Sequence, residues 1–307
     1  MTPSVFKNAV STKTENSIPS NRTTVTLGRT PVHRATSWCS PSFFWMTIAP
    51  LAFLIGGTII IEIANLDLKV SSFFFDSAID RFPLKNAEPW FTLSNWGCYP
   101  GLVLGVAGLA AGLIGCVVPR LRSMARPGLI LGGILLIGPG VLVNILVKDL
   151  WGRPRPEQTV VFGGDMQYRP LYQPGTTDLG AHSFPCGHAS IGFYLMAPAF
   201  VFWRTRPRLS AAFLALGMTM GLFIGYCRMI QGSHFLSDVL WSAGIVYFTG
   251  LMFHYSFGEK PKISSYDGSN RPMSRIERRA SIDFAIGKIQ LPLSVARGEL
   301  AAVHRVA

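Results

Sequence analysis

Residues 128–147 read GLILGGILLIGPGVLVNILV, a run of 20 positions without a charged side chain. A helix of about 20 apolar residues is long enough to cross the hydrocarbon core of a bilayer, which is about 30 Å thick. The composition agrees, because 49% of the 307 residues are hydrophobic, 14% are charged and the mean hydropathy is +0.34. Ordinary soluble domains carry about 25% charged residues. The sequence therefore predicts an integral membrane protein.

Apolar runs of this kind recur along the chain and predict an all-α bundle of six transmembrane helices. The runs cover residues 42–64, 99–118, 128–147, 188–203, 209–226 and 238–257. We expect one membrane domain over residues 42–257. The flanking stretches 1–41 and 258–307 are basic and lack such runs, so we expect a disordered N-terminal tail and a cytoplasmic C-terminal tail.

Arginines indicate on which side of the membrane the links between these runs lie. The links 119–127 and 204–208 each carry three arginines and no acid, and the positive-inside rule places such links in the cytoplasm. With both termini inside, the links 65–98, 148–187 and 227–237 face outward. Link 148–187 nevertheless carries several basic residues. An anionic ligand on the outer face would explain them.

Composition and cysteine spacing exclude several other classes. The net charge of +12 is distributed as membrane topology requires, so we expect no nucleic-acid partner. The five cysteines form no CxxC pair of metal-binding type, and no Rossmann, P-loop or EF-hand motif is present. The sequence therefore predicts neither a metal nor a cofactor.

Three polar clusters remain, and all three fall at outward ends of the predicted spans. They read KDLWGRPRP at 148–156, FPCGHAS at 184–190 and CRMIQGSHFLSD at 227–238. A single polar helix end is unremarkable. Three on one membrane face, holding two histidines, a lysine and several arginines, indicate one shared site.

The cations of these clusters suit a phosphoryl group. Lys148, Arg155 and Arg228 would neutralise a dianion, and an arginine binds two oxygens at once. The backbone N–H groups of residues 186–188, at the start of a predicted helix, add an anion site. Gly187 lets the backbone approach the ligand closely.

The histidines of the clusters suit proton transfer and nucleophilic attack. His234 and Asp238 are four residues apart, so at helical spacing the carboxylate would fix the tautomer of the imidazole. Such a pair is typical of an activated nucleophile. His188 would then protonate a leaving oxygen. Taken singly, each feature also fits a snorkelling cation, a helix cap or an ordinary ion pair, but their combination favours a site.

The clusters together resemble the signature of the type 2 phosphatidic acid phosphatase superfamily, which reads Lys-x6-Arg-Pro, Pro-Ser-Gly-His and Ser-Arg-x5-His-x3-Asp. This chain shows Lys148-x6-Arg155-Pro156, Pro185-Cys186-Gly187-His188 and Cys227-Arg228-x5-His234-x3-Asp238. The resemblance covers about residues 42–257. It implies a six-helix membrane enzyme that hydrolyses lipid phosphomonoesters or pyrophosphates without a metal.

The resemblance also implies a role for each motif residue. His234 would attack phosphorus and become a phosphohistidine held by Asp238, while His188 would protonate the leaving alcohol and then activate water. The phosphoryl oxygens would be bound by Lys148, Arg155, Arg228, Cys186 and Gly187. Arg153 is not a fixed position of the family, so the resemblance leaves its role open.

Two motif positions depart from the family pattern, because cysteines stand at 186 and 227 where the family has serines. A thiol is a weaker hydrogen-bond donor than a hydroxyl, which puts the contribution of Cys186 to phosphoryl binding in doubt. One interpretation is two neutral exchanges, since free cysteine packs as a small apolar residue. The other is a disulfide between Cys186 and Cys227 that switches the site off.

The substrate is less closely defined than the chemistry. The pattern GRPRP followed by FGG resembles bacterial members that act on lipid A, which implies a bacterial inner-membrane protein with its site facing the periplasm. The aromatic-rich link 148–187 would cover a bulky head group, and Arg169 and His182 would bind a second anion or else be solvated. Undecaprenyl pyrophosphate, phosphatidylglycerophosphate and phosphatidic acid stay open as substrates. A lipid phosphotransferase stays open as the activity, whereas a transporter is disfavoured by the few polar residues within the spans.

Overall fold

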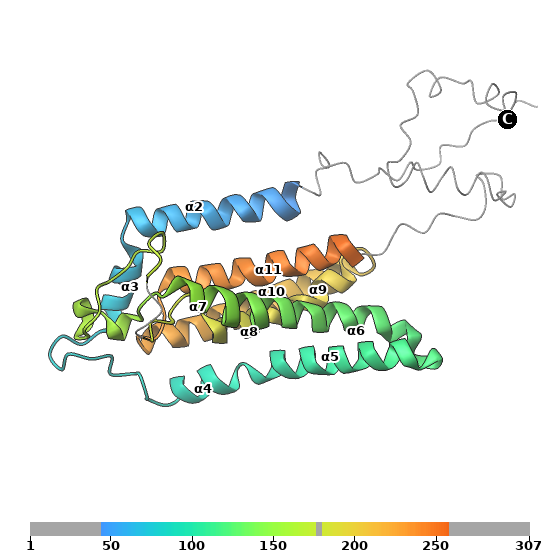
Figure 1. Ribbon diagram of the computed structural model, residues 1–307, viewed down its shortest axis with the longest axis horizontal. Helices are drawn as coiled ribbons and strands as arrows, with labels where there is room; N and C mark the ends of the chain where they lie inside the picture. Colours follow the sequence, from blue (N-terminus) through green and yellow to red (C-terminus); the bar gives the residue numbers. More distant parts are fainter. Residues whose placement is uncertain (1–43, 176–179, 258–307) are drawn as a thin grey trace, which may run out of the picture. The chain divides into compact units, whose positions relative to one another are not determined.

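The computed structural model of the chain describes residues 44–175 and 180–257, and these residues contain helices, turns and irregular segments but no β-strand (Figure 1). The expected all-α class is confirmed. The predicted tails, 1–41 and 258–307, lie outside the described residues.

The helices follow one another in two groups, separated by a long irregular link. The first group comprises η1 (Phe44–Ile48), α2 (Ala49–Ile63), α3 (Leu66–Phe74), α4 (Trp90–Trp96), α5 (Tyr99–Val117), η2 (Pro119–Leu121), α6 (Arg122–Leu135), η3 (Leu136–Val147) and α7 (Lys148–Trp151). The link contains the short turns η4 (Pro156–Gln158) and η5 (Val160–Phe162). The second group comprises α8 (Gly187–Tyr194), α9 (Ala197–Phe202), α10 (Pro207–Ile230) and α11 (Leu236–Phe257).

Five helical segments of the described chain are long and apolar enough to cross a membrane. They are Phe44–Ile63, Trp90–Val117, Pro119–Val147, Pro207–Ile230 and Leu236–Phe257. The expected span at 188–203 corresponds to α8 and α9, which form a shorter apolar stretch, Gly187–Phe202. The count of six spans therefore stays a prediction.

Two predicted boundaries were wrong, and both errors come from charged residues at helix ends. Residues 119–127, expected to be a link, form η2 and the first turns of α6, and Pro127 lies inside that helix. Helix α10 continues past 226 to Ile230, so Cys227 and Arg228 belong to its last turns and not to the following link. Long basic side chains reach water from the end of a span, and a cation also suits a helix C-terminus.

The α5–α6 pair shows how glycine sets the packing distance. Five glycines of α5 are buried along one face: Gly101, Gly105, Gly108, Gly112 and Gly115. A Cβ on Gly128 of α6 would lie 2.4 Å from the carbonyl oxygen of Gly108 and from the backbone nitrogen of Gly112. Side chains are excluded at this crossing, so the two backbones meet directly, as in other closely packed membrane helices.

The short helices α8 and α9 lie at the centre of the bundle. Both contact α6, α10 and α11. Their side chains supply much of the core, with Phe193, Tyr194, Met196 and Phe200 at most 2% exposed. By contrast, α2 turns large apolar side chains outward, including Phe53 at 73% and Ile63 at 79% exposed. Such exposure is expected where lipid, not water, surrounds the helix.

Four helix ends meet where the polar clusters lie. Helix α8 begins at Gly187 beside the end of η3, and it contacts both α10 and α11. Helix α7 follows η3 directly, and η3 contacts α8. The antiparallel course of α10 and α11 brings the end of one beside the start of the other, and so all three clusters reach one end of the bundle.

Candidate active site

The three clusters converge on His188. His188 belongs to the second cluster, and its imidazole lies within electrostatic range of four residues of the other two. These are Lys148 and Arg155 of the first cluster and Arg228 and His234 of the third. The structure thus brings together the two histidines and the three cations that the sequence singles out.

His234 and Asp238 contact each other, but not along a helix. His234 lies in the turn before α11, whereas Asp238 lies in the first turn of that helix. The expected helical spacing was therefore wrong, and the turn makes the contact instead. His234 Nδ1 is 3.5 Å from Asp238 Oδ2, and the two side chains are 2% and 0% exposed. That distance exceeds an ordinary hydrogen bond, and such contacts often tighten when substrate binds.

Asp238 is held by three donors besides the imidazole. The Ser183 hydroxyl donates to Oδ2 at 2.5 Å, and the backbone N–H of Phe235 donates to the same oxygen at 2.9 Å. Arg153 Nη1 donates to Oδ1 at 2.6 Å. The bond from Phe235 is half of a capping box, because a helix residue at the third position bonds the N-cap backbone. The Asp238 carboxylate therefore caps the N-terminus of α11 and also contacts the candidate nucleophile, His234.

Arg153, whose role the motifs left open, is the centre of a buried charge network. Its side chain is fully buried, and Nη2 donates to Asp67 Oδ2 at 2.7 Å while Nη1 also reaches Ser237 Oγ at 2.7 Å. Burial alone would lower the pKa of Arg153, but the carboxylates of Asp238 and Asp67 raise it above its ordinary value. The guanidinium therefore stays charged.

Asp67 connects this network to α3. It is 1% exposed and accepts hydrogen bonds from the backbone N–H and the hydroxyl of Ser237, at 2.9 and 2.6 Å. Sequence reasoning missed Asp67. The sequence offered one indirect signal, an arginine without an assigned role and a carboxylate on another outward link that could pair with it. Buried charges are tolerated when they are paired and hydrogen-bonded. Here two carboxylates share one guanidinium.

Cys186 lies against the imidazole of His234. The thiol is fully buried and within hydrogen-bonding range of that side chain. Burial alone would raise the pKa of Cys186, yet His234 brings it below its ordinary value. Burial alone would lower the pKa of His234, yet Cys186 and Asp238 raise it. Each group therefore shifts the pKa of the other in the direction that favours its charged form.

Cys227, the second cysteine at a motif position, is also fully buried, and it lies near the end of α10. Both cysteines are free thiols in the structure. Cys186 acts electrostatically on a third cysteine, Cys98, whose thiol lies 3.5 Å from the carbonyl oxygen of His188. The structure thus gives no support to pairing Cys186 with Cys227.

Gly187 begins α8 at a point of close approach. A Cβ there would lie 2.5 Å from the amide oxygen of Asn144 on η3. The Asn144 amide is itself held by the carbonyl of Pro139 at 2.7 Å. A side chain at 187 would therefore displace the Asn144 amide, and this close approach brings the N-terminus of α8 beside η3.

Two of the arginines have buried N–H groups that donate no hydrogen bond. The Nε atoms of Arg155 and Arg228 are buried without a hydrogen-bond partner. Arg228 is oriented by Gln231, which accepts from Nη1 at 2.7 Å and in turn donates to Ser94 Oγ at 3.2 Å. A buried donor without an acceptor is uncommon, and a bound anion would supply the acceptor.

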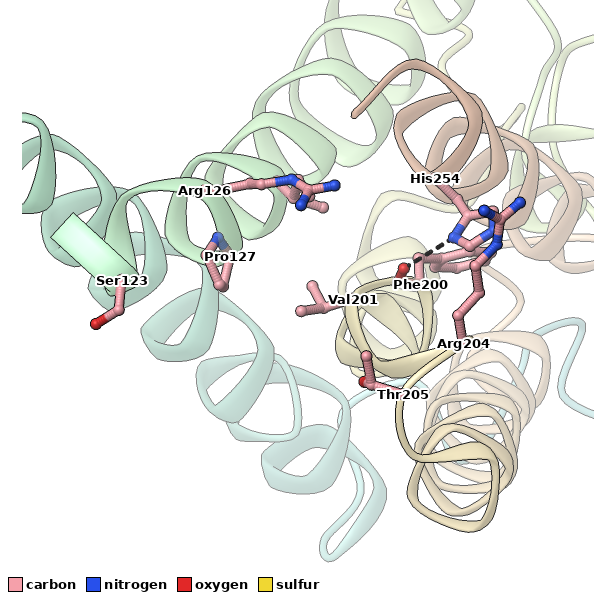
Figure 2. A pocket seen from close by; sticks show the side chains of 9 residues that line it. Ser123, Arg126, Pro127, Phe200, Val201, Arg204, Thr205 and His254 are labelled. Atoms are coloured by element: carbon pink, nitrogen blue, oxygen red, sulfur yellow. Dashed lines mark hydrogen bonds between the residues drawn. The ribbon is translucent and has the colours of Figure 1, made fainter. Parts of the chain in front are cut away.

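A cavity of about 200 Å³ lies at the opposite ends of the helices. Figure 2 shows its arginines, Arg126 and Arg204, the second beside His254. The imidazole of His254 bonds the carbonyl of Phe200, with Nδ1 at 3.1 Å from the oxygen. No carboxylate lines this cavity, so it offers no nucleophile with an orienting partner.

Within residues 44–175 and 180–257, no group of three or more His, Cys, Asp or Glu side chains is placed to hold a metal ion. Independence from metal remains an expectation that chelation can test.

We expect Cys186→Ser to raise the rate of phosphate release several-fold at mildly acidic pH. A serine hydroxyl cannot ionise beside His234, so the pKa of the imidazole falls and more of it is neutral and nucleophilic at low pH. The acidic limb of the pH–rate profile should therefore move to lower pH. The measurement is kcat against pH for wild type and variant. Cys227→Ser is the matched control and should leave the profile unchanged, while an unshifted profile for Cys186→Ser would contradict the coupling.

Comparison with known proteins agrees with the motifs. The family described as PAP2 superfamily matches residues 127–262. A lipid A 4'-phosphatase of Francisella tularensis subsp. novicida (strain U112) is 31% identical over 186 residues, which are 60% of this chain and 82% of that protein. A lipid A 4'-phosphatase of Rhizobium leguminosarum is 35% identical over 123 residues, which are 39% of this chain and 51% of that protein. No solved structure matches the chain.

The resemblance seen in the three motifs is thereby confirmed. The alignment with the first relative covers most of that protein's length. All three motifs lie inside the region that the family matches. The chain belongs to the PAP2 superfamily of lipid phosphatases.

Proposed function

We propose that the protein hydrolyses the phosphate monoester of a lipid A-type glycolipid through a phosphohistidine at His234. Family membership and the names of the curated relatives support lipid phosphate hydrolysis. The observation that carries the proposal is the buried pair of His234 and Asp238 facing His188, with Lys148, Arg155 and Arg228 around it.

The first step transfers the phosphoryl group to the enzyme. Asp238 contacts Nδ1 of His234, which leaves Nε2 to attack phosphorus as the bond to the leaving oxygen breaks. His188 donates a proton to that oxygen, and the lipid departs as an alcohol. Arg155 and Arg228 bind the equatorial oxygens with the donors that have no protein acceptor.

The second step releases phosphate. His188, now neutral, takes a proton from water as the water oxygen attacks the phosphohistidine. The bond between phosphorus and nitrogen breaks, and inorganic phosphate and free His234 are regenerated. Asp238 stabilises the imidazolium through both steps, and Arg153 holds that carboxylate in place.

The protein is a multi-pass bacterial membrane protein, as its apolar helices and bacterial relatives support. We propose that the site faces the periplasm, because arginines concentrate at the opposite helix ends, in segments 119–127 and 204–208. We keep the domain boundaries at 42–257, with a basic tail on either side.

A substrate panel tests the proposal. The purified enzyme is incubated with lipid A, undecaprenyl pyrophosphate, phosphatidylglycerophosphate and phosphatidic acid in EDTA, and free phosphate and product mass are measured. We expect phosphate release from lipid A that chelation does not diminish. Activity that disappears in EDTA and returns with a divalent ion would contradict the metal-free mechanism. Label that moves to a second lipid, without free phosphate, would identify a phosphotransferase instead.

A further inference from the structure

A polar pocket of about 760 Å³ opens beside the candidate active site. It lies between segments 80–87 and 157–163, and its polar lining consists of Asp80, Arg81, Lys85, Asn86, Glu157 and Gln158. Its volume falls within the range of about 300 to 1,000 Å³ typical of small-molecule sites. Neither the motifs nor the proposed chemistry assigns it a role.

The charges of the polar pocket are balanced, unlike those around His188. Two cations, two carboxylates and two amides line it, and Lys85 Nζ pairs with Glu157 Oε2 at 2.5 Å. An anion would find no excess of positive charge in this lining. Donors and acceptors in equal supply suit a neutral group with many hydroxyls, because each hydroxyl both donates and accepts.

The outer rim of the polar pocket is held in a fixed conformation. Asp76 and Arg81 exchange backbone hydrogen bonds of 3.0 and 3.3 Å, which close the turn that carries Asp80. Asp80 has a left-handed φ of 53° and Gly163 one of 79°. A Cβ on Gly163 would lie 2.7 to 2.9 Å from the Asp80 carboxylate, so a glycine is required there. Left-handed residues of this kind occur frequently at binding sites.

The floor of the polar pocket is continuous with the turn that carries His234. Phe82 and Phe162 pack edge to face at 5.6 Å and share one buried cluster with Phe235, the neighbour of His234. A Cβ on Gly232 would lie 2.4 Å from the Phe82 ring. The pocket and the candidate nucleophile are therefore positioned by the same rigid aromatic cluster.

Glu157 joins the polar pocket to the phosphate clamp. Its backbone N–H donates to the carbonyl of Gly232 at 3.0 Å, and its side chain lies 3.9 Å from Arg155 Nη1 as well as beside Lys85. A molecule with its phosphate at Arg155 would thus reach the pocket with the group next to that phosphate.

We propose that the polar pocket binds the carbohydrate part of a phosphorylated glycolipid while the phosphate lies between Arg155 and Arg228. This inference rests on the proposed function and deepens it, because it gives the site a preference for sugar phosphates over glycerol phosphates. The pocket then acts as a specificity site, separate from the groups that break the phosphate bond.

The test compares one substrate with the sugar and one without it. Asn86→Trp fills the pocket, and Arg81→Ala removes one of its donors; both residues line the pocket, and neither belongs to the candidate catalytic or phosphate-binding residues. We expect KM for lipid A to rise about tenfold, as the loss of one or two hydrogen bonds predicts. The kcat/KM for short-chain phosphatidic acid should stay unchanged. Gln167→Ala, an exposed amide on the same link and outside the pocket, is the control and should alter neither substrate.

The outcomes separate this inference from the proposed function. Equal losses on both substrates, or no loss on lipid A, would overturn the pocket's role and leave the phosphatase standing. If wild type hydrolyses neither substrate, the proposed function fails, and binding of a water-soluble, neutral N-acetylglucosamine disaccharide is measured by calorimetry. Wild type should bind that disaccharide at least about tenfold more tightly than Asn86→Trp, since the indole fills the space. Equal affinities would overturn the inference.

Discussion

Replacing His234 by alanine is expected to abolish phosphate release, with a fall in kcat of at least about a thousandfold. The imidazole is buried in contact with the Asp238 carboxylate, which orients it, and it lies within electrostatic range of His188. Phosphate release from lipid A in detergent micelles and EDTA measures the effect. Substrate binding should persist, because the cations that hold the phosphate are unchanged.

A comparison with His188→Ala makes the assignment specific. Loss of the acid should matter little for a phosphate ester with a good leaving group, such as p-nitrophenyl phosphate, since that group departs without a proton. His188→Ala should therefore still release p-nitrophenol in a rapid burst, followed by slow turnover because hydrolysis of the phosphohistidine needs His188 to activate water, whereas His234→Ala should show no burst. A burst in both variants, or a labelled phosphoenzyme in His234→Ala, would assign the nucleophile elsewhere.

The second large effect is expected for Arg153→Met. The substitution leaves Asp67 and Asp238 buried without a counter-charge, and breaking a buried ion pair in this way costs about 3 to 5 kcal/mol. We expect a lower midpoint of thermal unfolding in detergent and a large loss of kcat. KM should change little, because Arg153 reaches the substrate only through Asp238 and His234.

A second substitution distinguishes positioning from folding alone. Arg153→Met combined with Asp67→Asn removes one of the two stranded carboxylates, and it should recover part of the stability. The rate should stay low, because Asp238 still lacks its partner. If stability and kcat recover together, Arg153 serves only the fold. If Arg153→Met is as stable as wild type, the network does not contribute as we describe.

The residues around His188 could be predicted because their signal is local. Fixed spacings such as Lys148-x6-Arg155 and His234-x3-Asp238 can be read from short stretches of sequence without knowledge of the fold. The pair of Arg153 and Asp67 has no such signal, since its two members are 86 residues apart and meet only when α3 packs against α11.

Helix ends were harder to predict than helix interiors. Apolar runs identified the membrane helices, but arginines at the starts of α6 and at the end of α10 resembled link residues. The side chain of an arginine reaches several ångströms from its backbone, so its charge says where the head group lies and not where the helix stops. The polar pocket was missed for another reason: its two walls come from separate links, and only the wall with Phe162 and Gly163 of the FGG pattern carries a sequence signal.

The Arg153 network also determines the shortest fragment of the chain in which every buried charge keeps its partners. The family match begins at residue 127, which suggests a compact unit that starts with α6. Yet the guanidinium inside that unit is neutralised partly by Asp67, on a helix contributed from outside it. A fragment cut at 127 would carry every motif and still bury an arginine that has lost one of its two carboxylates. A fragment that keeps both carboxylate partners of Arg153 must therefore begin before α3, some 60 residues ahead of the start of the family match.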